Sequence, residues 1–402
     1  MKKMFQNITS LISVEMKSIK NCKILSMIGT FENCINLESF KIEGFNVENI
    51  KSLEKTFHNT KIKEIDLNVL NNIQIEDISY MLALSPIKYF NFSIIDFSNI
   101  KNISHLFENC SSLEEIIIPS IINLDKLEDI SYMFRGCESL VSLDLSNFMQ
   151  TNNLKDMSHL FQDCVLLNSL DLSNLNTKIV KDMSFMFEGC SSLQIIDITN
   201  FETINVEYMK NMFKLCNSLI EIKTDINKFI TINAINMSQM FYNCRSLINI
   251  PLNIFCSEKT EDISFMFSYC SSRKQINLDK FNTNNIKNMS HLFKDCTSLT
   301  SIDVSALNTS KVIDMSFLFS ELISINTLDI SNFQTENVIN MSHLFEGCIS
   351  LNNLNLYNLN IKKVKDMSSL FKNCKSLTSL NIISFLQIML KIFPQCSKIV
   401  LI

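Results

Sequence analysis

Three recurring columns of side chains could carry chemistry in this 402-residue chain. Four of its five histidines and twelve of its 14 cysteines recur at a nearly constant interval, and so do aspartates in short strand-like segments. Histidine suits acid–base chemistry, cysteine suits nucleophilic or redox chemistry, and aspartate suits cation binding. A catalytic centre needs different groups that converge on one point, whereas each of these groups fills a repeated slot. The repetition therefore favours a structural or binding role.

The interval is set by phenylalanine, which recurs about every 26 residues from Phe5 to Phe371, with Leu82 filling one gap. Fifteen units result, and a partial one follows at Phe393. Self-similarity of this period predicts a solenoid in which each unit contacts only its neighbours. We expect a single solenoid over 1–402, regular over 107–381, irregular over 57–106 and ending in a partial unit at 382–402.

One unit shows the expected local structure. Segment 156–164 has apolar residues at i, i+3, i+4 and i+7, which predicts a short helix with one buried face, capped by Asp156. Segment 167–175 alternates, with Leu170 and Leu172 on one side and Asp171 on the other, which predicts a strand. The predicted fold class is an α/β solenoid, a right-handed superhelix with a parallel sheet on one face and short helices on the other.

The pattern L-x-x-L-x-L-x-x-N-L stands out in segment 139–148 and is followed by the helical motif at 155–161. This pattern is a leucine-rich repeat signature. In its fuller form it resembles the BspA-like leucine-rich repeats of bacterial and protist surface proteins, above all their 26-residue subclass. The resemblance implies a parallel-stranded solenoid and, for family members, attachment to cell surfaces or binding of host or matrix proteins.

The outward strand position carries aspartates that we take as the candidate binding residues. Neighbouring like charges are destabilising unless they are solvated, hydrogen-bonded or met by a cation. Three interpretations stay open: bonding to nearby Ser or Asn groups, a basic protein ligand, or a metal ion. The residues are Asp144, Asp171, Asp197, Asp303 and Asp329.

A second candidate surface lies two residues before the repeat phenylalanine. In a helix this position is nearly opposite the buried face, so it predicts an exposed aromatic stripe on the convex side. Stacking between neighbouring units is the structural alternative to a contact surface. The stripe consists of Tyr80, His105, Tyr132, His159, Phe185, Phe265, His291, Phe317 and His343.

The cysteine column lies three residues after the repeat phenylalanine, on the predicted buried face. A disulfide ladder and a row of reduced core thiols both fit this placement. We predict reduced thiols, which favours a reducing compartment, and no metal site, because the chain has no C-x-x-C pair. The column is Cys34, Cys110, Cys137, Cys164, Cys190, Cys216, Cys244, Cys270, Cys296, Cys348, Cys374 and Cys396.

Composition narrows the partners and the location. A net charge of −5 with three arginines argues against nucleic acid, and the longest apolar candidate, 382–393, is too short and too polar for membrane insertion. The polar residues after Lys3 argue against a signal peptide, so we predict a cytoplasmic protein, with the cell surface as the alternative implied by the resemblance. Neither end has a polar capping unit, which predicts a longer gene product or end-to-end self-association.

These observations lead to one functional prediction and one alternative. With five glycines and no phosphate-binding loop, the chain is expected to be no enzyme and to need no cofactor. We predict a scaffold that binds a protein ligand on its strand face, with a basic protein as one candidate. The alternative is a cell-surface adhesin or structural surface protein of the BspA-like type.

Overall fold

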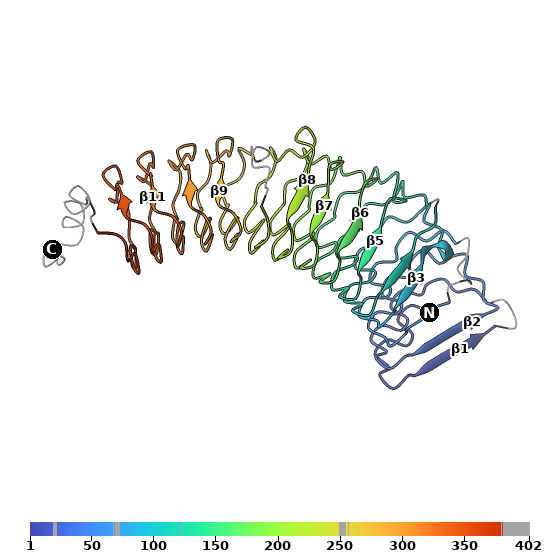
Figure 1. Ribbon diagram of the computed structural model, residues 1–402. Helices are drawn as coiled ribbons and strands as arrows, with labels where there is room; N and C mark the ends of the chain where they lie inside the picture. The colour runs from blue at the N-terminus through green and yellow to red at the C-terminus, as the bar shows by residue number, and fades with distance from the viewer. Residues whose placement is uncertain are drawn as a thin grey trace. The chain divides into compact units, whose positions relative to one another are not determined.

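The computed structural model describes residues 1–18, 22–66, 68, 73–120, 122–248, 255, 257–378 and 380. The chain divides into two compact units: unit 1 is Met1–Val206 with Leu215–Phe229, and unit 2 is Glu207–Lys214 with Ile230–Ile402. Each unit is a parallel β-solenoid (Figure 1). The expected partial unit at 382–402 lies outside the described residues, and the expectation of a single solenoid stays a prediction.

Short parallel strands mark successive turns, as predicted. The expected strand around Leu170 is β6, and it pairs in register with β5. Unit 1 contains β1 (Ser13–Lys17), β2 (Ser39–Glu43), β3 (Tyr89–Asn91), β4 (Glu115–Ile117), β5 (Ser142–Asp144), β6 (Ser169–Asp171), β7 (Ile195–Asp197) and β8 (Glu221–Lys223). Unit 2 contains β9 (Gln275–Ile276), β10 (Ser301–Ile302), β11 (Thr327–Leu328) and β12 (Asn353–Leu354).

The prediction of a short helix in each repeat is wrong for the described residues. The described residues contain one short 3-10 helix, η2 (Phe92–Ile94), and no α-helix. His159 and Asp163 have φ values of 58° and 59°, which an α-helix does not allow. Their N–H groups donate to the carbonyls of Ser184 and Glu188 in the next turn, over 2.9 and 2.7 Å. The N–H of Gln162 donates to the carbonyl of His159, three residues back, which is a β-turn bond.

Asp156, which was expected to cap a helix, lies at the start of a series of β-turns instead. Asp156 forms isolated parallel bridges with Asp129 and Asp182, and its Oδ1 accepts the N–H of Ser158 over 2.8 Å. The predicted side-chain bond is therefore present, but it begins a run of turns rather than a helix. The bridge position recurs thirteen times in the described residues, so the predicted number of fifteen repeats is not confirmed. It is Ser52, Asp77, Asn102, Asp129, Asp156 and Asp182 in unit 1, and Tyr208, Asn236, Asp262, Asn288, Asp314, Asn340 and Asp366 in unit 2.

The repeat phenylalanines build the core of each unit, as their spacing predicts. In unit 1, Phe161 is fully buried between Phe134 and Phe187, with ring centroids 5.6 and 5.8 Å apart and nearly parallel planes. In unit 2, Phe345 stacks in the same way between Phe319 and Phe371. Each turn thus covers the apolar face of the turn before it. Among the described residues, no helix is long and apolar enough to cross a membrane.

Candidate functional site

The outward strand positions of unit 1 bring three predicted aspartates onto one face. Because alternate strand residues point to opposite faces, Asp144 of β5 is exposed while the preceding Leu143 is buried. Asp144 lies opposite Asp171 of β6 in the parallel register. In the next strand pair, Asp197 of β7 lies opposite Lys223 of β8. The row is therefore acidic over three turns and changes sign at the fourth.

Local hydrogen bonds hold each carboxylate of this row in place. Oδ1 of Asp144 accepts the N–H of Ser146 over 2.8 Å, and Oδ1 of Asp171 accepts the N–H of Ser173 over the same distance. Hydrogen bonds from the side chain and the backbone of Ser146 hold the pKa of Asp144 below its ordinary value, and Thr199 lowers the pKa of Asp197 in the same way. The carboxylates of Asp144 and Asp197 therefore stay charged at neutral pH.

The same face is hollowed into a groove of about 830 Å³, formed by β4 to β7 and the turns that follow them. Five of its lining residues are acidic, and none of its described lining residues is basic. Glu114 is paired with Lys88 at 2.8 Å, at the edge of the groove. Clustered charges of one sign in a concave site attract a partner of the opposite sign. The acidic residues are Glu114, Glu115, Asp144, Asp171 and Asp197.

The remaining two predicted aspartates lie elsewhere. Asp303 and Asp329 belong to unit 2, where each is exposed and accepts an N–H bond of 2.9 Å from the serine two residues later. The sequence-based prediction missed Glu114 and Glu115 of the groove. A comparison of repeat slots could have identified Glu115, because it occupies the strand position that Ser142 occupies in the next turn.

The predicted aromatic stripe is half-buried rather than exposed, because its rings stack face to face. Its residues adopt positive φ in the β-turn, for example 58° at His159. In unit 1, Tyr80, His105, Tyr132, His159 and Phe185 form one stack, with centroid separations of 3.9, 4.3, 4.1 and 4.3 Å. In unit 2, Phe265, His291, Phe317 and His343 form another, with separations of 4.0, 4.4 and 4.2 Å. Stacking between turns therefore accounts for this column.

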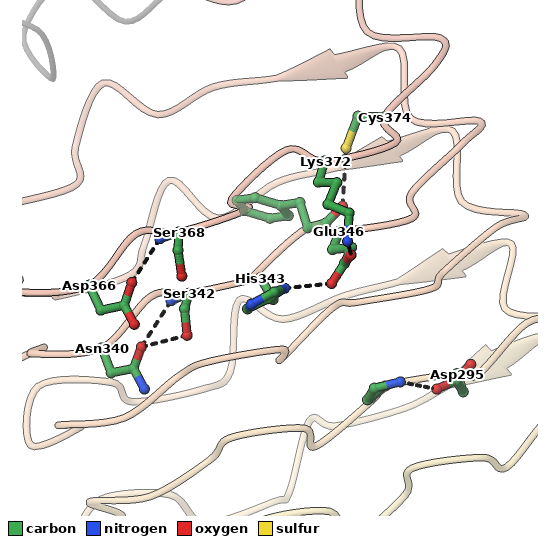
Figure 2. Close-up of polar contacts among 11 residues, drawn as sticks. Asp295, Asn340, Ser342, His343, Glu346, Asp366, Ser368, Lys372 and Cys374 are labelled. Carbon is green, nitrogen blue, oxygen red and sulfur yellow. Dashed lines mark hydrogen bonds and ion pairs between the residues drawn. The ribbon is translucent and has the colours of Figure 1, made fainter.

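Three of the four stripe histidines, His105, His159 and His343, bond to the side chain three residues later, whereas Nδ1 of His291 is buried without a hydrogen-bond partner among the described residues. Nδ1 of His343 lies 2.6 Å from Oε2 of Glu346, whose other carboxylate oxygen lies 2.6 Å from Nζ of Lys372 (Figure 2). His105 contacts Glu108 at 2.8 Å in the same way. The ion pair between Glu346 and Lys372 links one turn to the next, and none of these contacts places a nucleophile beside an imidazole.

We expect His291 to make unit 2 less stable in acid. Burial, and then the charge of Lys294, lower its pKa to about 4, against about 6.5 in an unfolded chain. The unfolded state therefore binds more protons below pH 6.5, so the stabilising contribution is present above that pH and is lost as pH falls toward 4. In the variant His291→Phe, which matches Phe265 and Phe317, the unfolding midpoint should fall less between pH 7 and pH 4.5. Equal falls in both proteins would contradict the prediction.

None of the described members of the cysteine column is in a disulfide, and all of them are buried except Cys374, which is half-buried. Each Sγ donates to a backbone carbonyl in the preceding turn: Cys164 bonds to Phe134 over 3.0 Å and Cys190 to Phe161 over 3.1 Å. Burial raises the pKa of Cys110 to about 12, which suppresses the reactive thiolate. Cys396 lies outside the described residues. Among the described residues, no group of three His, Cys, Asp or Glu side chains could hold a metal ion.

The solved structures that resemble this chain include a leucine-rich repeat protein from Bacteroides ovatus, with 18% identity, a TM-score of 0.49, and coverage of 92% of this chain and 85% of that one. A leucine-rich cell surface protein from Faecalibacterium prausnitzii has 17% identity, a TM-score of 0.31, and coverage of 73% and 78%. No curated protein matches the chain.

A family model described as "Mycoplasma protein of unknown function, DUF285" matches residues 1–94, 84–194, 155–277 and 261–384. The overlapping matches cover almost all of the chain and follow its repeats. The 26-residue repeats also fit the BspA-like leucine-rich repeats that the sequence resembles. The chain therefore belongs to the DUF285 family.

Proposed function

We propose that this protein is a non-enzymatic scaffold that binds a basic protein in the acidic groove of unit 1. The observation that supports the proposal is the groove itself, with five carboxylates and no basic side chain among its described lining residues. Asp144 and Asp171 lie opposite each other on adjacent strands, and both carboxylates are exposed. A lysine or arginine of a partner can therefore contact both and gain two charge-assisted hydrogen bonds.

Neutralising the row should weaken binding of a basic probe. We expect the variant Asp144→Asn, Asp171→Asn, Asp197→Asn to bind a dye-labelled Ser-Lys repeat peptide about 3- to 150-fold more weakly, because three exposed ion pairs together contribute about 0.6–3 kcal/mol. Asparagine keeps the Oδ1 acceptor of each turn, as Asn355 does for the N–H of Tyr357 in unit 2. Fluorescence anisotropy at several salt concentrations measures the effect.

A matched control is the variant Asp303→Asn, Asp329→Asn, which removes two charges at equivalent strand positions in unit 2. It should bind the peptide as the unmodified protein does. An equal loss in both variants would show that overall charge, rather than the groove, attracts the probe. Unchanged binding in the triple variant would contradict the proposal.

A second candidate function is adhesion at the cell surface, which the BspA-like repeats support. Protease treatment of intact source cells separates the two settings. Digestion of the chain before lysis favours the adhesin, and protection until lysis favours an intracellular partner.

A further inference from the structure

A smaller hollow adjoins the acidic groove on the side of β3. It has a volume of about 320 Å³ and is lined by β3, by Ile94 and Ile117, and by Glu64, Ile65, Asp66 and Asn68. Tyr89 and Ile117 line this hollow and are 49% and 47% exposed, so together they present apolar surface that a partner can cover. Strand β4 borders both hollows, since Ile117 lines the small one and Glu115 lines the groove.

The two hollows belong to one row of outward side chains. β3 pairs with β4 so that Asn91 lies opposite Ile117, and Ile117 occupies the slot that Asp144 and Asp171 hold in later turns. The row therefore passes from an exposed apolar residue to three carboxylates. It then reaches Lys223, which repels a further positive charge. The row itself runs from Ile117 through three carboxylates to Lys223, which gives it a direction.

We propose that the groove recognises an extended segment with an apolar side chain at one end and lysines or arginines after it. The apolar side chain covers Tyr89 and Ile117, and the basic side chains meet Asp144, Asp171 and Asp197. This inference rests on the proposed function and adds the chemistry of the partner. Neighbouring strands are about 4.8 Å apart, so the row from Ile117 to Asp197 is about 14 Å long, which an extended chain spans in about five residues.

Charge and exposed apolar area together select this occupant. A purely basic segment leaves the apolar surface of Tyr89 and Ile117 in water. A purely apolar segment removes water from three carboxylates without giving them a charged partner. A segment that carries both satisfies each part of the face. Lys223 excludes a long basic run, because a fourth positive side chain would lie against it.

Three dye-labelled peptides test the inference. The anchored peptide is Leu-Ser-Lys-Ser-Lys, whose alternate side chains face one side and span about 14 Å when it is extended. The unanchored peptide replaces Leu with Ser, and the shuffled peptide, Lys-Ser-Leu-Ser-Lys, keeps the composition of the first. We expect the unmodified protein to bind the anchored peptide about tenfold more tightly than either of the others, because burying one leucine is worth that much or more.

Protein variants separate the contribution of the leucine to peptide binding from that of the lysines. In the variant Tyr89→Thr, Ile117→Thr, which keeps strand-compatible residues at exposed positions, the anchored and unanchored peptides should bind equally. If they already bind equally to the unmodified protein, or if the advantage persists in this variant, the anchor inference is wrong. In that case, binding that still depends on Asp144, Asp171 and Asp197 leaves the proposed function standing. If no peptide binds the unmodified protein, both proposals fail.

Discussion

Replacing Phe161 with alanine should destabilise unit 1 by about 3–5 kcal/mol, the usual cost of removing a buried aromatic ring. Phe161 is fully buried, and its ring contacts one phenylalanine on each side, so the cavity opens to both neighbouring turns. In a solenoid these contacts between neighbours supply much of the stability. Denaturant unfolding followed by circular dichroism measures the change.

Phe161→Leu is the matched control for this variant. The chain itself carries a leucine in the same column, because Leu82 fills the slot and is fully buried. The leucine variant should therefore lose only a fraction of the stability that the alanine variant loses. An alanine variant within about 1 kcal/mol of the unmodified protein would show that the turn collapses around the cavity.

Gly44→Ala should destabilise the β1–β2 pair by about 3 kcal/mol or more, since it combines backbone strain with a steric clash. Gly44 follows β2 and has φ of +72°, and an added Cβ would lie 2.3 Å from the backbone carbonyl oxygen of Ser18. The backbone cannot move away without breaking the bond from the N–H of Ser18 to the carbonyl of Glu43. Hydrogen exchange of the β1 and β2 amides reports the loss locally.

Gly29→Ala controls for positive φ alone. Gly29 has φ of +57°, but its added Cβ would meet only the side chains of Glu32 and Lys3, at 3.0 and 3.3 Å. Lys55 occupies the same turn position with φ of 55°, so a side chain is tolerated there. We expect a loss of about 1 kcal/mol. Equal effects at both glycines would show that the contact with Ser18 is unimportant.

The repeat pattern predicted the strands correctly, but it did not predict the β-turns. The alternation around Leu170 predicted β6 correctly, because a strand with one buried face requires that period. The spacing of Met157, Leu160, Phe161 and Cys164 suggested a helix and proved to be a series of β-turns. Both structures return apolar residues to one side every three to four positions, so spacing alone does not separate them.

The sequence by itself determined the repeat, the buried phenylalanine and cysteine columns, and the outward aspartates, because burial and side-chain alternation are properties of single turns. Only the tertiary structure decided between helix and turns, since the N–H of His159 donates to Ser184 in the next turn. It likewise decided that Glu114 and Glu115 join three aspartates in one groove. These features depend on how one turn is placed on the next, and neighbouring turns are separated by about 26 residues of chain.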